Sequence, residues 1–214
     1  MSWPNYRLMA DISDNNAEFN AAQYASAGHV AVAIKATEGT NFTSPTYVKW
    51  VEAAHEHGLS VIHYHFAHPE DDNPVEQANY FHSVIEPHFR RPGDYCAFDV
   101  ETGSYQQAQE FLRQADKRMR DISRMHPWVY APLSYYDGAG LTVESGHVWL
   151  AAWGANEPHA RHGETAVAWQ FSDGAVGPVP HTFAGIGRAD GSLINKKFAD
   201  QLRKDYNRRR HPKK

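Results

Sequence analysis

Short apolar runs alternate with amphipathic segments along the first half of the chain. The apolar runs are residues 8–12, 30–34, 61–66 and 95–100. Runs this short, bounded by polar and turn-forming residues, indicate buried strands. The segments between them, which place apolar side chains at helical spacing, are residues 17–27, 47–57, 75–85 and 106–125. Strand followed by helix, repeated along the chain, predicts parallel strands joined by helical crossovers.

Polar residues that favour helix starts lie near the beginning of each amphipathic segment. They are Asn16, Thr46, Asn73 and Ser104. Their side-chain oxygens can accept a hydrogen bond from a first-turn N–H group that has no partner inside the helix. We therefore expect helices to begin close to these residues.

The second half of the chain keeps the strands but loses most of the helices. A fifth apolar run covers residues 128–131, and further strands are expected at 148–152, 166–171 and 187–189, with Gly and Pro between them. Residues 197–206 predict a closing helix. Eight strands with helices reduced in the second half predict an α/β fold, a TIM-like β/α barrel. A doubly wound open sheet is the alternative, although no Gly-rich dinucleotide fingerprint follows the first strand.

Composition narrows the class of protein. The chain has 214 residues, 42% of them hydrophobic, so we expect one sizeable core in a single domain over residues 1–206. The formal net charge of -4 argues against nucleic acid as a partner. Positive charge is clustered in the tail, residues 207–214, which is either a frayed terminus or a segment attracted to an anionic surface. The single cysteine, Cys96, lies in an apolar run and is expected to be a buried, unreactive thiol.

The sequence shows neither an export signal nor a membrane span. Its first residues contain no apolar core of a signal peptide, and no run approaches the roughly 18 apolar residues that cross a bilayer. We therefore expect synthesis in the cytoplasm without stable membrane insertion. A target outside the cell would then require another protein for release.

Two carboxylates stand at the end of the apolar run at residues 95–100. Alternate residues of a strand point to the same side, so Asp99 and Glu101 are expected to point the same way as Ala97. In a barrel this set points inward, and the carboxyl ends of the strands are where barrel enzymes place their active sites. Burying two carboxylates without a task is costly, which favours a functional role for the pair.

The same rule collects polar and aromatic residues from the other strand ends. They are Asp11, Lys35, Glu38, His63, Tyr64, His65, Tyr130, Trp153, Gln170 and Asp190. Carboxylates from the first, fourth and eighth strands would meet at one rim, where mutual repulsion raises at least one pKa. A neutral carboxylic acid beside ionised carboxylates suits glycosidic bond cleavage, and aromatic rings at the rim would stack on sugar faces. Taken alone, Asp11 is better explained as a solvated loop residue or a helix cap.

Several stretches of the sequence resemble, in order, the motifs of glycoside hydrolase family 25, the Chalaropsis-type lysozymes common among phage endolysins. They are MADISDNN, AIKATEGTNF, VIHYHFAHP, CAFDVE, HVWLAAW, AWQFSDG and RADGS. The resemblance implies a phage or prophage endolysin, an N-acetylmuramidase. Such an enzyme hydrolyses the β-1,4 bond between N-acetylmuramic acid and N-acetylglucosamine in bacterial peptidoglycan. We expect it to be a monomer and to need no cofactor.

By motif position, the resemblance also implies roles for the candidate residues. Glu101 matches the general acid, and Asp99 matches its partner, which stabilises positive charge or orients the 2-acetamido group of the substrate. Asp11 and Asp190 match the aspartates of the first and the last strand, and the resemblance implies that they too are catalytic. The sugar-binding groove is implied to contain Lys35, Tyr64, Tyr130 and Trp153.

The spacing of the Asp-Val-Glu motif bears on the reaction path. Residues two apart on a strand are separated by roughly 6.6 to 6.8 Å between Cα atoms. This exceeds the usual spacing of a retaining pair with a carboxylate nucleophile. The substrate carries an N-acetyl group that can attack its own anomeric carbon, so we hypothesise a substrate-assisted path in which Asp99 stabilises an oxazolinium. Inversion at the anomeric carbon would contradict this path.

Other classes of function fit the sequence less well. Histidines are frequent between His55 and His68, but they lack the ligand spacing of a metal site and are better explained by hydrogen bonds, so we expect no metal. A glycan-binding module that keeps the groove without turnover is the alternative to an enzyme. A Ser-His-Asp hydrolase is disfavoured because the sequence has no Gly-x-Ser-x-Gly elbow.

Overall fold

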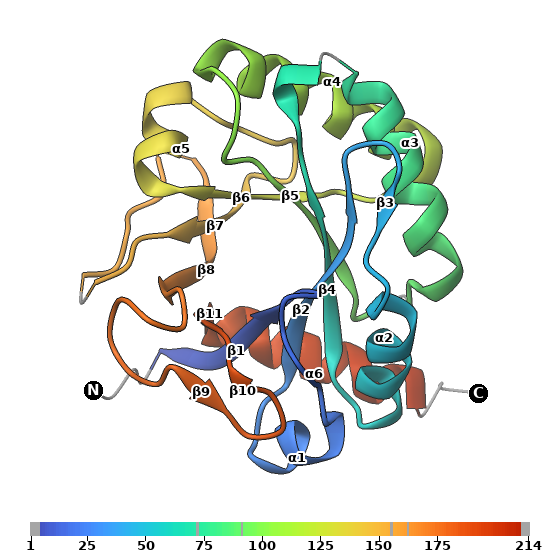
Figure 1. Ribbon diagram of the computed structural model, residues 1–214, viewed down its shortest axis with the longest axis vertical. Helices are drawn as coiled ribbons and strands as arrows, with labels where there is room; N and C mark the ends of the chain where they lie inside the picture. Colours follow the sequence, from blue (N-terminus) through green and yellow to red (C-terminus); the bar gives the residue numbers. More distant parts are fainter. Residues whose placement is uncertain (1–4, 72, 91, 155, 162, 211–214) are drawn as a thin grey trace.

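Eight strands close into a barrel in the computed structural model, which describes residues 5–71, 73–90, 92–154, 156–161 and 163–210 (Figure 1). In order around the barrel they are β1 (Tyr6–Ile12), β11 (Asp190–Asn195), β8 (Thr165–Ser172), β7 (His147–Ala151), β6 (Trp128–Pro132), β5 (Tyr95–Asp99), β4 (Ser60–Phe66) and β2 (Ala31–Glu38). The barrel closes where β2 pairs with β1. The short strand β3 (Phe42–Thr43) extends the edge of β2, and β9 (Thr182–Phe183) pairs with β10 (Gly187–Arg188) in a separate hairpin. The predicted α/β barrel is confirmed.

The last barrel strand runs against its neighbours. The pairings from β1 through β2 to β8 are parallel, as predicted, whereas β11 is antiparallel to both β8 and β1. The segment predicted at residues 187–189 does form a strand at Gly187 and Arg188, but its predicted place in the barrel is wrong, because this strand is β10 of the hairpin and the barrel strand begins at Asp190. Antiparallel strands need no helical crossover, so the small β9–β10 hairpin suffices between β8 and β11. The first residue of β11 therefore lies where the other strands end.

Helices cover the outside of the barrel (Figure 1). They are α1 (Ala21–Ser26), α2 (Tyr47–Glu56), α3 (Pro74–Ile85), α4 (Tyr105–Ser123), α5 (Leu133–Ala139) and α6 (Lys196–Arg210), with single 3-10 turns at η1 (Pro69–Asp71) and η2 (Glu86–His88). The sequence pattern missed α5, which has 7 residues, too few to show a helical period. The described helices include none long and apolar enough to cross a membrane.

The C-terminal helix is longer than predicted. It continues to Arg210 instead of ending at residue 206, so the first part of the predicted tail is helical. Residues 211–214 of that tail lie outside the described residues.

The helix starts follow the predicted caps in part. Ser104 forms a complete capping box at the start of α4. Thr46 and Asn73 occupy the N-cap positions of α2 and α3, but their side chains make no cap hydrogen bond. The prediction for Asn16 is wrong, because α1 begins later and Asn20 accepts the capping hydrogen bond.

Side chains alternate along the strands between two cores. In β5, Ala97 belongs to the core inside the barrel, whereas Cys96 and Phe98 pack under the helices, as the strand period predicts. Ala199 and Leu202 of α6 join the inner core and so close one end of the barrel. The opposite end, where the parallel strands finish, remains open.

Candidate active site

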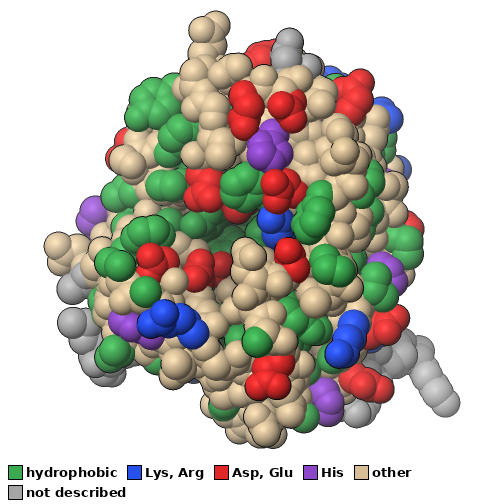
Figure 2. Space-filling model, viewed as in Figure 1, with side chains coloured by type: hydrophobic (Ala, Val, Ile, Leu, Met, Phe, Trp, Pro, Cys, Tyr) green, Lys and Arg blue, Asp and Glu red, His purple; other side chains and the backbone are tan. Residues whose placement is uncertain are grey.

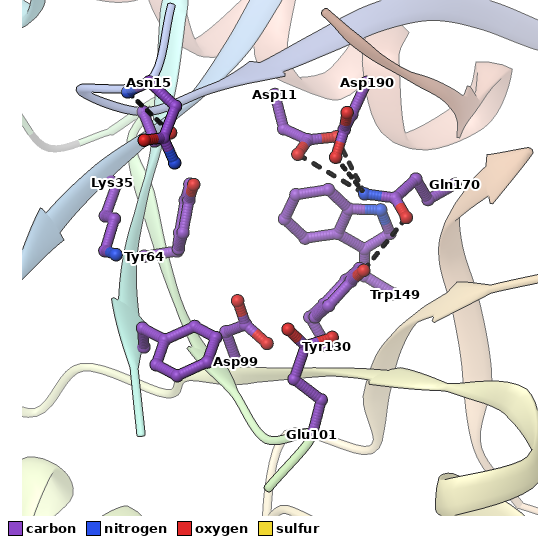
Figure 3. Close-up of a pocket in the computed structure, with 12 residues that line it drawn as sticks. Asp11, Asn15, Lys35, Tyr64, Asp99, Glu101, Tyr130, Trp149, Gln170 and Asp190 are labelled. Atoms are coloured by element: carbon purple, nitrogen blue, oxygen red, sulfur yellow. Dashed lines mark hydrogen bonds between the residues drawn. The ribbon is translucent and has the colours of Figure 1, made fainter. Parts of the chain in front are cut away.

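A pocket of about 210 Å³ opens at the carboxyl ends of the parallel strands (Figure 3). Every barrel strand contributes a residue to its wall, and β5 is followed by a second one, Glu101, just beyond its end. The lining residues are Asp11, Ser13, Asn15, Lys35, Tyr64, Phe66, Asp99, Glu101, Tyr130, Trp149, Gln170 and Asp190. In the space-filling view, acidic side chains surround a hollow on this face (Figure 2). Four carboxyl groups from distant parts of the sequence therefore meet at one mouth.

One amide connects two of the aspartates. Asp11 and Asp190 are paired in the register of β1 and β11, and the Gln170 side chain of β8 points toward both (Figure 3). The Gln170 NH₂ group lies 3.2 Å from Asp11 Oδ2 and 3.3 Å from Asp190 Oδ2. Its oxygen accepts hydrogen bonds at 2.9 Å from the Tyr130 hydroxyl and at 2.9 Å from the Trp153 indole. Two donors on the oxygen determine which end of the amide faces the aspartates.

Asp99 and Glu101 lie on the opposite side of the pocket (Figure 3). Asp99 is the last residue of β5 and only 8% exposed, whereas Glu101 follows the strand and reaches solvent at the mouth. The Oδ1 atom of Asp99 is buried, and no described residue offers it a hydrogen bond. Leaving a buried acceptor unsatisfied costs free energy, so this oxygen is suited to accept a hydrogen bond from a ligand.

Burial raises the pKa of all four carboxyl groups, and neighbouring carboxylates add to the shift at Asp11, Asp99 and Asp190. Burial and the nearby charge of Glu101 raise the pKa of Asp99 well above its ordinary value, and burial and Asp190 do the same for Asp11. Burial also raises the pKa of Asp190, to about 6. At Glu101, partial burial raises the pKa while the positive charge of Lys35 opposes the shift. The pocket can therefore hold protons near neutral pH, as the sequence predicted.

Lys35 brings positive charge to the pocket wall. Its ammonium group donates a hydrogen bond to Glu38 Oε2 at 2.6 Å and lies 5.1 Å from the centroid of the Phe66 ring. In this position the ammonium charge acts to lower the pKa of both Asp99 and Glu101. Glu38 pairs with Lys35 but is not itself part of the pocket wall.

Most of the residues predicted at strand ends reach the pocket. Those in its wall are Asp11, Lys35, Tyr64, Asp99, Glu101, Tyr130, Gln170 and Asp190. Trp153 stands at the edge, 52% exposed, with its indole bonded to Gln170. His63 and His65 point away from the pocket, and their ring nitrogens bond buried side chains under the helices. Over the described ranges, no group of three or more His, Cys, Asp or Glu side chains is arranged to hold a metal ion.

The sequence pattern did not single out the rest of the wall. These residues are Ser13, Asn15, Phe66 and Trp149. The ring of Trp149 meets that of Tyr130 edge to face at 4.8 Å, and its indole donates to the Ser192 hydroxyl at 3.0 Å. Strand alternation could have identified Trp149, because it shares the parity of Trp153 within HVWLAAW. The loop residues after β1 carry no periodic signal.

Comparison of the sequence with known proteins identifies relatives. The profile of glycosyl hydrolases family 25 matches residues 10–178. The autolytic lysozyme of Clostridium acetobutylicum is 28% identical over 159 residues, which cover 73% of this chain and 47% of that protein. The N,O-diacetylmuramidase of Chalaropsis sp is 42% identical over 74 residues, 33% of this chain and 35% of that protein. The chain spans about half the length of the curated relatives it matches.

Solved structures share the barrel. A bacterial lysozyme from Streptomyces coelicolor superposes with a TM-score of 0.74 at 23% identity, over 94% of this chain and 97% of that one. A muramidase from Acremonium alcalophilum gives a TM-score of 0.76 at 22% identity, over 94% and 98% of the two chains. At this level of identity the likeness concerns the fold.

Proposed function

The chain belongs to glycosyl hydrolase family 25, and we propose that it is a lysozyme acting on bacterial peptidoglycan. The bond it cleaves is the β-1,4 bond between N-acetylmuramic acid and N-acetylglucosamine. The observation that carries this proposal is the gathering of Asp11, Asp99, Glu101 and Asp190, all with raised pKa values, in one open pocket. Cleavage of a glycosidic bond requires an acid that keeps its proton beside groups that stabilise positive charge.

Glu101 is the general acid in this proposal. It stands at the mouth, where its carboxyl group can reach both the pocket and a leaving sugar. Glu101 gives its proton to the glycosidic oxygen as the bond to the anomeric carbon breaks, and the acetamido oxygen of the muramic acid attacks that carbon to form an oxazolinium. Water then adds to the anomeric carbon and reopens the ring. The Glu101 carboxylate takes a proton from this water and is ready for another turnover.

Asp99 is the proposed partner of the acid. Its buried Oδ1 can accept the acetamido N–H and keep an anion beside the positive oxazolinium. In the free protein burial raises the pKa of both Asp99 and Glu101. A hydrogen bond from the substrate favours ionised Asp99, and the proton shared among the coupled carboxyl groups then becomes available at Glu101.

The other predicted residues bind the sugar in this proposal. Asp11 and Asp190, joined by Gln170, face the pocket and can accept hydrogen bonds from sugar hydroxyl groups. Trp153 offers an exposed ring at the edge, where a sugar face can stack. Lys35, Tyr64 and Tyr130 complete the wall.

The products of digestion test the proposal. Purified peptidoglycan is incubated with the protein, and the released fragments are analysed by mass spectrometry. A lysozyme creates new reducing ends at muramic acid. Binding to the wall without fragment release would instead support a glycan-binding module on the same barrel. The anomeric configuration of the first product, followed by NMR, is expected to be retained, and inversion would exclude the substrate-assisted path.

We also propose that the protein serves as a phage or prophage endolysin whose access to the wall depends on another protein. This proposal rests on the motif resemblance. Expression in a bacterial cytoplasm, with and without an agent that permeabilises the membrane, tests it. Lysis confined to permeabilised cells supports dependence on release, and lysis without permeabilisation contradicts it.

A further inference from the structure

A row of alternating charges begins at Lys35 in the pocket wall and leads away from the pocket. Lys35 lies 2.6 Å from Glu38, and Glu38 lies 3.0 Å from His68. His68 lies 3.0 Å from Glu70, whose second oxygen is 3.0 Å from the Thr102 hydroxyl. These residues come from β2, from the segment after β4 with η1, and from the loop after β5. The row therefore connects three neighbouring segments of the mouth and ends next to the proposed acid.

The geometry requires His68 to be positively charged. Its Nε2 lies 3.0 Å from Glu38 Oε1, and its Nδ1 lies 3.0 Å from Glu70 Oε1. Ionised carboxylates only accept hydrogen bonds, so both ring nitrogens must carry hydrogen. Burial lowers the pKa of His68, but the hydrogen bonds to Glu70 and Glu38 outweigh it and raise that pKa. The other titratable groups that face His68 are Lys35 on β2 and His65 on β4.

The backbone of His68 has a rigid support. Gln77 of α3 is fully buried; its oxygen accepts the His68 N–H at 3.0 Å, and its NH₂ group donates to the His68 carbonyl oxygen at 2.8 Å. The same oxygen lies 3.1 Å from His65 Nε2. The imidazole of His68 therefore reaches its two carboxylates from a fixed base.

The loop that carries Glu101 is held by contacts that its neighbours Thr102 and Gly103 make with other segments. In the described part of the chain, no hydrogen bond reaches the Glu101 carboxyl group, so the loop backbone determines where that group lies. On one side of the loop Thr102 contacts Glu70. Gly103, at φ +76°, approaches so closely that a Cβ would lie 3.3 Å from Glu70 Oε2. On the other side the Tyr135 hydroxyl lies 2.7 Å from the Gly103 carbonyl oxygen.

We propose that His68 is a positioning residue: as a cation it holds Glu70 against Glu38 and, through Thr102, fixes the loop that aims Glu101 at the leaving oxygen. The inference rests on the proposed role of Glu101 and adds a residue that does not line the pocket. If His68 is neutral, Glu38 and Glu70 repel each other and the loop loses the contact between Thr102 and Glu70, while the longer contact of 3.2 Å from the Thr102 hydroxyl to the Ala67 carbonyl oxygen and the contact with Tyr135 stay. The cation is fully present below the ordinary histidine pKa and is lost as pH rises through the raised pKa of the folded protein.

Three variants test the inference: His68→Gln, Glu70→Gln and the double variant. His57→Gln, at an exposed histidine at the end of α2, is the matched control. Soluble peptidoglycan fragments are digested across the pH range in which the parent is active. At acidic pH His68→Gln is expected to lower kcat about tenfold, the order of loss when a reacting group is slightly misplaced, with KM within twofold of the parent. The difference in kcat should shrink as pH rises, because the parent loses the same charge.

A second readout does not require activity. Hydrogen–deuterium exchange of residues 99–105 should be faster in His68→Gln than in the parent at acidic pH, while the rest of the barrel is unchanged. The double variant should be no worse than either single one, because all three break the same row. Unchanged exchange and kcat in His68→Gln, additive losses, or an effect on KM alone would overturn the inference. If the parent itself releases no muramic reducing ends, the proposed function fails. Hydrogen–deuterium exchange of residues 99–105 still tests whether His68 holds the loop.

Discussion

Among the individual residues of the pocket, the two sides differ in how their polar atoms are satisfied. On one side the Gln170 amide donates to both Asp11 and Asp190, and two donors on its oxygen hold it in place. On the other side Asp99 keeps a buried oxygen without a partner among the described residues. The first side is already satisfied by protein groups, whereas the second is completed only by a ligand. This asymmetry favours Asp99 and Glu101 as the reacting side.

Replacing Glu101 by Gln removes the proposed acid while keeping its shape. We expect the release of muramic reducing ends to fall by about 10²- to 10⁴-fold, the range for loss of a general acid, with binding of glycan fragments retained. Glu76→Gln, an exposed position on α3, serves as the control and should be unaffected. Fragment release is measured by mass spectrometry and binding by calorimetry. Equal turnover in Glu101→Gln and the parent would show that Glu101 is not the acid.

Replacing Gln170 by Glu puts a further carboxyl group between Asp11 and Asp190. At neutral pH we expect the free energy of unfolding to fall by about 2 kcal/mol, because the two aspartates lose their shared donor and gain a repelling neighbour. Near pH 4 the loss should be smaller, since protonated carboxyl groups can donate. Denaturant unfolding at both pH values measures the effect. Gln109→Glu, exposed on α4, is the control, and a loss of the same size there would contradict the explanation.

At the element scale, the segment between β8 and β11 delivers Asp190 to the pocket. Its hairpin packs against the start of α1, where Asn20 donates its backbone N–H to the Gly185 carbonyl oxygen at 2.6 Å. Gly185 has φ +78°, and a Cβ there would lie 2.4 Å from the Asn20 carbonyl oxygen. Close backbone approach therefore requires glycine at this position.

Two glycines of this hairpin form a matched pair for a stability test. Gly185 and Gly187 both have φ near +80°, so alanine strains the backbone alike at each, but nothing lies within 4 Å of a Cβ at Gly187. We expect Gly185→Ala to lower the free energy of unfolding by about 1–3 kcal/mol more than Gly187→Ala, the usual cost of overpacking. Thermal or denaturant unfolding measures the difference. Equal losses would mean that the contact with α1 does not constrain the hairpin.

At the scale of the whole molecule, the barrel concentrates carboxyl groups at one end while α6 closes the other. The raised pKa values mean that the folded protein binds more protons than the unfolded chain just above the ordinary carboxyl pKa. Stability from these groups is therefore fully present below that pKa and is lost as pH rises through the folded values. Asp94, buried beside His55, behaves in the opposite sense: burial alone would raise its pKa, but histidine partners lower it.

Asp190→Asn should make the protein less sensitive to pH. The pKa of Asp190 rises from 3.8 to about 6 on folding, so the parent loses stability between about pH 4 and pH 7. Since one pKa unit corresponds to about 1.4 kcal/mol, we expect the variant to gain on the order of 3 kcal/mol over the parent across that interval. Unfolding free energies measured at both pH values give the answer. Asp200→Asn, exposed on α6, is the control and should show the same change of unfolding free energy with pH as the parent. If Asp190→Asn also changes as the parent does, the pKa of Asp190 is not raised on folding.

Local periodicity predicted the parallel part of the barrel but not its closing strand. From β1 to β8 the apolar runs are continuous and helices separate most of them, so period and spacing both carry information. In β11, Gly191 and Ser192 interrupt the apolar pattern. The direction of β11 depends on its pairing with β1 and β8, which lie far away in sequence, and no local signal encodes that pairing.

The inward-pointing residues of the barrel can be identified from the sequence alone, because side chains of a strand alternate whatever the strand pairs with. That rule placed Asp99 inward and Phe98 outward, and it gathered the carboxylates at the strand ends. The bridge from Gln170 to Asp11 and Asp190 could not be predicted in this way, because that contact depends on the register between strands that are distant in the chain. The contacts of His68 with Glu38 and Glu70 could not be predicted either, because they join loop segments that carry no periodic sequence pattern.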